Sequence, residues 1–228
     1  MQSLRPLLGL LALLSPALWA SPMPDLMATL QFDSREMSAD GIDQRHSYRE
    51  TWIRQGHTLW SERQIPESVR HAFEQQHEHS KTPHKHFIPE MAARWVTQDA
   101  DGQFHLEYVD GDHKQRVFYP ATEYGQAGFR PDWAQLSRLF DPAQLKELTA
   151  TGETGEHDSR WYERRQGDQI LRVLWSDSLQ LALAIDRQTQ DGYRQYHMRA
   201  TLAPALPSPL PWQQLTDYQQ KEVSDFLD

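Results

Sequence analysis

Histidines crowd into one short segment of the chain. Five of the 11 histidines lie between residues 71 and 86, and four of them form the pairs His77/His79 and His84/His86 around a Pro-containing turn at 80–83. Because alternate residues of an extended chain point the same way, each His-x-His pair offers two imidazoles to one ion. We therefore predict a metal site whose ligands, with Glu74 or Glu78 as oxygen alternatives, are His71, His77, His79, His84 and His86.

The chain contains no cysteine. Its absence excludes disulfide frameworks, thiolate zinc sites, cysteine nucleophiles and haem attached through cysteine, so we expect Cu(II) or Zn, or a haem bound without a covalent link. A second interpretation stays open, because histidine-rich tracts are compositional evidence only. In that interpretation the segment is a hydrated loop whose His, Gln, Glu and Lys residues keep a connection soluble.

No catalytic motif is present in the sequence. It contains no Gly-x-Ser-x-Gly elbow, no phosphate-binding Gly-rich loop and no His-Glu-x-x-His pair. A hydrolase with two carboxylates would draw on Glu62, Glu67, Glu74 or Glu90, but nothing in the sequence places any two of them together. We assign no catalytic residue and favour a binding protein over an enzyme.

Tryptophans offer a second kind of site. Trp52, Trp95 and Trp175 lie in segments with strand character. Either they fill the core, because each ring buries a large apolar area, or they line a cavity between a curved sheet and its helices. In the second interpretation these three residues bind an apolar ligand such as an acyl chain or a haem.

Turn signals divide the chain into many short strands. Asp-Gly pairs begin at residues 40, 101, 110 and 191, and Gln-Gly pairs begin at 55 and 166. We expect strands at about 28–35, 46–54, 58–64, 92–97, 104–108, 115–119, 160–165, 169–175, 181–187 and 193–201. Short connections favour antiparallel pairing, and one sheet face is buried, as the alternation from Leu179 to Ile185 indicates. The predicted fold class is mainly β with helices (α+β), a curved, largely antiparallel sheet or half-barrel wrapping one or more helices.

Helical patterns and a proline-rich stretch complete the predicted domain organisation. Helices are expected at 66–79, at 132–148 with a break at Pro142, and at 212–227. Residues 21–202 form a single β-rich domain, 203–211 a proline-rich strap, and 212–228 a docking helix in which Trp212, Leu215 and Tyr218 share one face.

The N-terminus and the net charge point to a compartment and exclude some partners. Residues 1–20 have one positive charge, an apolar run from Leu7 to Leu14 and a small-residue exit, which is typical of a signal peptide cleaved after Ala20 or Ala17. The run is too short to span a bilayer, so we expect a periplasmic protein with no membrane span after cleavage. The net charge of −9 argues against nucleic acid as a partner.

A family resemblance is carried by the segment Gly152–Thr201. It contains Trp161–Arg165, a turn, the stretch Leu171–Asp177 ending in Trp-Ser-Asp, the alternating aliphatics of Leu179–Ile185, and a long final strand. In this rhythm the segment resembles the second half of the periplasmic lipoprotein-carrier (LolA-like) half-barrel proteins. The resemblance implies a half-barrel that carries or chaperones a lipid or an apolar client, with a periplasmic or outer-membrane protein as a partner. It assigns no site residue.

Three functions remain in competition. The first is a non-enzymatic periplasmic protein that binds a transition metal (Cu or Zn) or haem at the histidine-rich segment. The alternative is a half-barrel carrier or chaperone for a lipid or apolar client, and the third is a carboxylate-dependent hydrolase.

Overall fold

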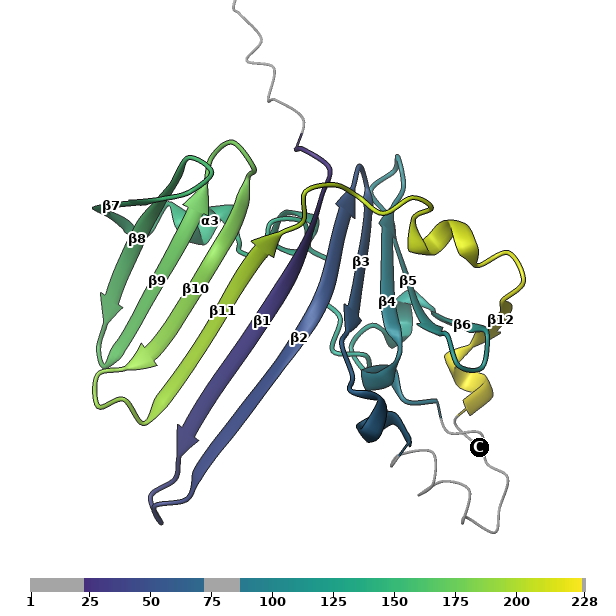
Figure 1. Ribbon diagram of the computed structural model, residues 1–228, viewed down its shortest axis with the longest axis horizontal. Helices are drawn as coiled ribbons and strands as arrows, with labels where there is room; N and C mark the ends of the chain where they lie inside the picture. Colours follow the sequence, from purple (N-terminus) through teal and green to yellow (C-terminus); the bar gives the residue numbers. More distant parts are fainter. Residues whose placement is uncertain (1–22, 72–86, 227–228) are drawn as a thin grey trace, which may run out of the picture.

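The computed structural model describes residues 23–71 and 87–226, which form one curved sheet of 12 strands (Figure 1). Across the sheet the order is β12-β6-β5-β4-β3-β2-β1-β11-β10-β9-β8-β7. The strands are β1 (Leu26–Met37), β2 (Asp43–Gln55), β3 (Thr58–Arg63), β4 (Ala93–Gln98), β5 (Phe104–Asp110), β6 (Gln115–Tyr119), β7 (Thr149–Gly155), β8 (Ser159–Gln166), β9 (Gln169–Ser176), β10 (Leu181–Thr189), β11 (Arg194–Leu202) and β12 (Gln219–Glu222). The predicted fold class, a curved and largely antiparallel sheet with few helices, is confirmed.

Strand β1 joins two meanders into one sheet. It pairs antiparallel with β2 on one side and with β11 on the other, so the first strand of the chain links β2–β6 to β7–β11. All ten expected strands are present, and β7 and β12 are additional. Strand β12 pairs with β6 in parallel, which makes it the exception in an otherwise antiparallel ladder.

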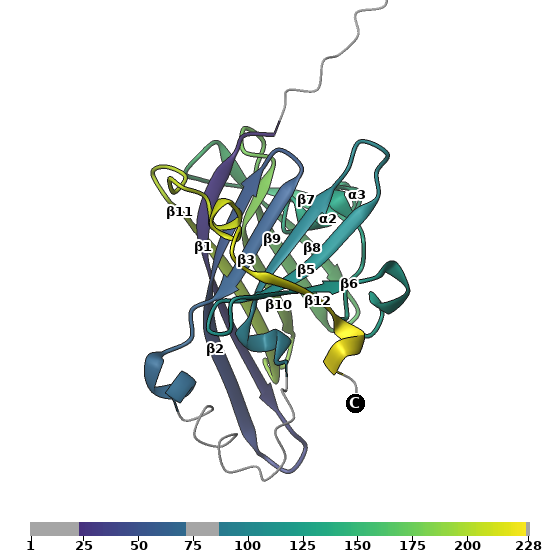
Figure 2. The ribbon, with the colours of Figure 1, turned by 90° about the vertical axis from the view of Figure 1, so that its right-hand side faces the viewer.

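The inner face of the sheet carries the main core. Alternate residues of the central strands, such as Leu30, Trp52 and Met198, are buried there against the segment that contains α2 (Trp133–Leu136) and α3 (Pro142–Leu145). Figure 2 shows these helices between the two halves of the bent sheet. The helix expected at 132–148 is two single turns instead, because Leu139 adopts a φ of 62° and a new turn begins at Pro142.

A buried arginine ties three segments together at one end of the inner face. Arg54 is 1% exposed, and its guanidinium donates to the carbonyls of Pro24 (2.9 Å), Leu179 (2.8 Å) and Ser137 (2.6 Å). Burial lowers the pKa of Arg54 to about 10, so the group stays charged at neutral pH. It thus fixes the start of β1 and the turn before β10 to the end of α2.

The C-terminal segment, residues 203–226, covers part of the outer face. Ile53 and Trp60 form a second apolar cluster there, together with Leu210 and Leu215 of that segment. Figures 1 and 2 show the segment in yellow crossing the sheet before it reaches the β6 edge. In place of the helix expected at 212–227 it forms η3 (Pro211–Gln214), β12 and η4 (Val223–Phe226), because residues 219–222 pair their backbone with the open edge of β6.

The remaining helical pieces are short. They are η1 (Pro89–Met91), η2 (Ala121–Glu123) and a turn at 67–71, where the helix expected at 66–79 begins. Within 23–71 and 87–226, no helix is long and apolar enough to cross a membrane. The predicted signal peptide, residues 1–20, lies outside the described residues.

Candidate ligand site

Three aromatic rings lie on the inner face beyond the core. Phe32 on β1 stacks on Tyr48 of β2 with ring centroids 4.7 Å apart, and the ring of Tyr196 on β11 lies 6.4 Å from Phe32. The strand register explains this contact. Phe32 pairs with Tyr48, and Ser34, the next residue of β1 on the same face of the sheet, pairs with Tyr196. All three rings are partly exposed, so they offer an apolar surface to a ligand.

Arginines surround these rings. The guanidinium of Arg63 lies 4.2 Å from the Tyr48 ring centroid, and that of Arg187 lies 5.8 Å from the Tyr196 ring. Such cation–π contacts hold the guanidinium planes without neutralising their charge. Arg94 lies on the same face, since it pairs with Ser61, which pairs with Trp52.

A single partly buried carboxylate lies among these arginines. Glu50 pairs with Arg63 across β2 and β3, and their nearest N and O atoms are 3.9 Å apart. Burial raises the pKa of Glu50, while the charges of Arg94 and Arg63 oppose that rise. Within the described residues, neither Arg94 nor Arg187 forms an ion pair with any carboxylate. Arg63 and Arg94 therefore act on Glu50, and the exposed Glu90 of the same region acts with Arg94 on Tyr108.

A groove lies beside the end of β2, and we call it the edge groove. Strand β3 pairs only with Glu50–Gln55, so the first half of β2, which precedes Arg49, has no partner on this side among the described strands. The groove encloses about 720 Å³ and wraps this edge, which explains why side chains of both sheet faces line it. Its lining residues are Gln31, Ser47, Tyr48, Arg49, Arg63, Gln64, Ile65, Pro66, Val69, Ile88, Glu90 and Met91.

The edge groove has an apolar wall and a charged end. Ile65, Val69, Ile88 and Met91 supply the apolar wall, and Val69 is 47% exposed although it is aliphatic. Tyr48 and Arg63 belong both to the groove and to the cluster around Glu50. Apolar walls with a few fixed polar groups are typical of ligand pockets of this volume.

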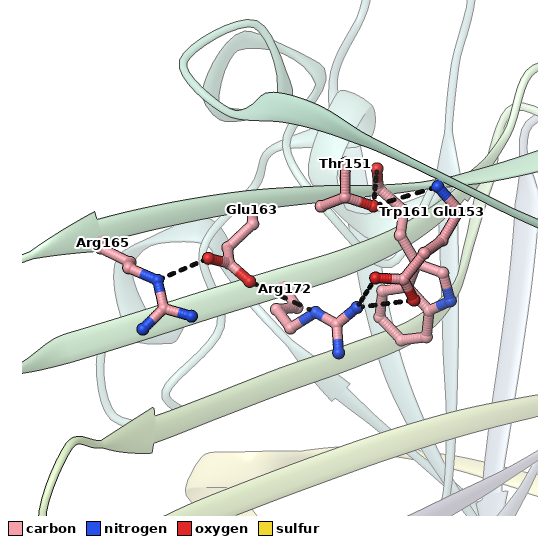
Figure 3. A network of polar contacts seen from close by, with 6 residues as sticks. All are labelled: Thr151, Glu153, Trp161, Glu163, Arg165 and Arg172. Carbon is pink, nitrogen blue, oxygen red and sulfur yellow. Dashed lines mark hydrogen bonds and ion pairs between the residues drawn. The ribbon is translucent and has the colours of Figure 1, made fainter.

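The outer face of β7–β11 has a different character. Arg172 donates to both carboxylate oxygens of Glu153 at 2.9 and 3.0 Å and lies 4.7 Å from the ring of Trp161 (Figure 3). Glu163 accepts from Arg165 at 2.6 Å and lies 3.5 Å from Arg172. The charges on this face are therefore paired with one another.

The predicted histidine site falls mainly outside the described residues. His77, His79, His84 and His86 all lie there, and only His71 is described, exposed and 3.5 Å from Glu67. Among residues 23–71 and 87–226, no group of three or more His, Asp or Glu side chains could hold a metal ion. Binding of Cu, Zn or haem at the histidine-rich segment stays a prediction.

The three predicted tryptophans are divided between the two apolar clusters. Trp52 and Trp175 are core residues, 3% and 6% exposed, and the indole of Trp175 donates to Asp177 at 3.0 Å. Trp95 lies in the apolar cluster of the outer face, beside Arg116.

Sequence reasoning did not identify the aromatic and arginine cluster. The Gln-Gly turn after β2 was a usable signal, because a two-residue hairpin fixes the register that places Glu50 opposite Arg63. Arg94 had no comparable signal, since 29 residues separate β3 from β4 and leave their register open.

The sequence matches no protein-family model and no curated protein. An uncharacterized conserved protein from Thermus thermophilus is similar in structure, with 12% identity and a TM-score of 0.42 over 88% of this chain and 91% of that one. A LolA superfamily protein from Nitrosomonas europaea has 10% identity and a TM-score of 0.34, over 82% and 89%. A DUF1329 family protein from Desulfovibrio piger has 6% identity and a TM-score of 0.30, over 83% and 89%.

The weak resemblance to LolA-like proteins seen in the sequence is thus found again among structural neighbours. It is a likeness of fold. Because all three TM-scores are below 0.5, the function proposed next rests on the side chains of this chain.

Proposed function

We propose that this chain is a periplasmic carrier that holds an apolar molecule, such as a single acyl chain, in the edge groove. The observation that carries the proposal is the apolar wall formed by Ile65, Val69, Ile88 and Met91 beside an open strand edge. The groove volume of about 720 Å³ lies within the range of small-molecule sites. The periplasmic location follows from the signal peptide predicted at residues 1–20.

The aromatic rings next to the groove support the same proposal. Phe32, Tyr48 and Tyr196 continue the apolar surface along the inner face, so a chain longer than the groove would stay out of water. Each buried CH₂ group contributes about 0.8 kcal/mol, which makes a chain of ten or more carbons a ligand of useful affinity.

The binding of a neutral apolar dye tests the proposal. N-phenyl-1-naphthylamine fluoresces in apolar surroundings, and we expect the mature protein to bind it at micromolar concentration. Val69→Glu places a charge in the groove and should weaken binding at least tenfold. Ile42→Glu is the matched control, because Ile42 is also an exposed aliphatic (56%) but does not line the groove.

Two outcomes would contradict the carrier function. One is a wild-type protein that does not enhance the dye fluorescence, and the other is an equal loss in Val69→Glu and Ile42→Glu. Mass spectrometry of the organic extract of the purified protein adds an independent measurement, since a carrier should retain a stoichiometric apolar ligand.

A further inference from the structure

The inner face carries a charge surplus that the apolar groove does not require. Arg63, Arg94 and Arg187 lie on this face with two carboxylates, the partly buried Glu50 and the groove-lining Glu90, in a chain whose net charge is −9. The distance of 3.9 Å between Arg63 and Glu50 is too long for a hydrogen bond, so Arg63 donates none of its N–H groups to this carboxylate.

The placement of these cations connects them to the groove. Tyr48 and Arg63 line the edge groove, and Arg94 raises the positive potential around Glu50 and Tyr48. A second hollow, of about 200 Å³, lies one row further along the inner face. Ser34, His46, Arg187 and Tyr196 line it in part, and so does the ion pair of Glu36 with Arg194. Arginine guanidinium groups match the planar oxygen pairs of phosphates and carboxylates better than other side chains do.

We propose that the ligand of this carrier is an anionic amphiphile, whose chain lies in the edge groove and whose phosphate or carboxylate group binds Arg63 and Arg94. The inference rests on the carrier function proposed above and names its substrate class. The opposite arrangement on the outer face supports it, because there the arginines are paired with Glu153, Glu163 and Asp186.

Calorimetric titration with three probes separates the contribution of the alkyl chain to the binding affinity from that of the anionic head group. The probes, used below their micelle concentrations, are dodecyl phosphate, dodecyl maltoside and inorganic phosphate. We expect dodecyl phosphate to bind at least tenfold more tightly than dodecyl maltoside, because charge-assisted hydrogen bonds are added to the same chain burial. Inorganic phosphate should bind at least a hundredfold more weakly than dodecyl phosphate, since it lacks the chain; tight binding of inorganic phosphate would show a free-anion site and overturn the amphiphile assignment.

Single substitutions test whether the arginines of the inner face cause the preference for dodecyl phosphate. Arg94→Gln and Arg63→Gln should each lower the affinity for dodecyl phosphate about tenfold relative to that for dodecyl maltoside. Arg165→Gln, on the outer face, is the control and should change neither affinity. Circular dichroism and melting curves of each variant confirm that it is folded.

The failures of the two proposals are distinguishable. If both dodecyl probes bind with equal affinity, or if Arg94→Gln and Arg63→Gln lose nothing, the anionic class is wrong while the carrier function stands. If neither dodecyl probe binds the wild-type protein, the carrier function fails and the anionic class fails with it.

Discussion

Two regions of the sheet, the outer face of β7–β11 and the inner face beside the edge groove, use arginine in different ways. On the outer face Arg172 donates to Glu153 and Arg199 lies 2.7 Å from Asp186, so cations and acids alternate and cancel. On the inner face beside the edge groove, Arg63 and Arg94 act on Glu50, Arg187 lies over Tyr196, and neither Arg94 nor Arg187 forms an ion pair among the described residues. The paired charges of the outer face satisfy one another, whereas the arginines beside the edge groove have the charge that the proposed anionic head group would complement.

Arg54 sharpens the comparison, because it is an inner-face arginine with a structural task. Arg54→Met leaves the carbonyls of Pro24, Ser137 and Leu179 without their charged donor and should lower the free energy of unfolding by about 3 kcal/mol. In a domain of this size that corresponds to a melting temperature about 6–12 °C lower in calorimetry. Arg94→Gln is the contrast and should shift it by less than about 2 °C. Equal shifts would remove the distinction between structural and ligand-binding arginines.

The C-terminal segment packs on only one half of the outer face. It contacts β2–β5 and does not extend over β7–β10 (Figure 1). Leu215 is 7% exposed in the cluster with Ile53 and Trp60, so Leu215→Ala should cost about 2–3 kcal/mol of unfolding free energy. Urea denaturation measures this cost. Tyr193→Ala, at a site 53% exposed, should leave the midpoint unchanged. A Leu215→Ala protein as stable as Tyr193→Ala would show that the segment is only loosely attached.

The paired charges of the outer face should contribute little to stability. Arg172 is partly exposed, and a surface ion pair is worth about 1 kcal/mol or less, so Arg172→Gln should lower the unfolding free energy by no more than that. The loss should shrink in about 1 M salt, where screening weakens surface pairs. A loss above about 2 kcal/mol in urea denaturation would mean that this network holds β7–β9 together.

The smallest expected effect is that of the acid on the inner face. Burial raises the pKa of Glu50 while Arg94 and Arg63 oppose it, so its contribution to stability is present at low pH and is lost as the pH rises through the folded-state pKa. Glu50→Gln abolishes this loss. Its melting temperature relative to wild type should therefore increase from about pH 4 to about pH 7. A relative melting temperature that falls over this range would show that ion pairing outweighs burial at Glu50.

Much of the fold follows from local sequence, and the exceptions have physical reasons. Glycine turns and alternating strands such as Leu181–Thr189 predicted ten of the strands and the antiparallel pairing. Strand β7 was missed because every residue of Thr149–Gly155 is exposed, so it has no apolar alternation. Strand β12 was missed because Gln-Gln-Lys-Glu forms a strand only through the β6 edge that it joins.

The candidate site was less predictable than the fold. It combines residues from strands far apart in the sequence, with Phe32 and Tyr48 on one hairpin and Tyr196 about 150 positions later. Their contact depends on the pairing of β1 with β11, which closes the two meanders and has no local signal. Dense histidines, in contrast, are visible in any sequence, which drew the prediction toward the segment 71–86.

The most direct test of the account is the position of a bound chain. A dodecyl phosphate analogue with a photoreactive diazirine at its chain end, irradiated in complex with the mature protein, should label the tryptic peptide of residues 64–70, which contains Ile65, Pro66 and Val69 of the edge groove. Peptide mass spectrometry identifies the labelled residue, and excess unlabelled dodecyl phosphate should abolish the signal. Competed labelling confined to the outer face, in residues 166–172 of the β8–β9 hairpin or in the C-terminal segment, would contradict the account.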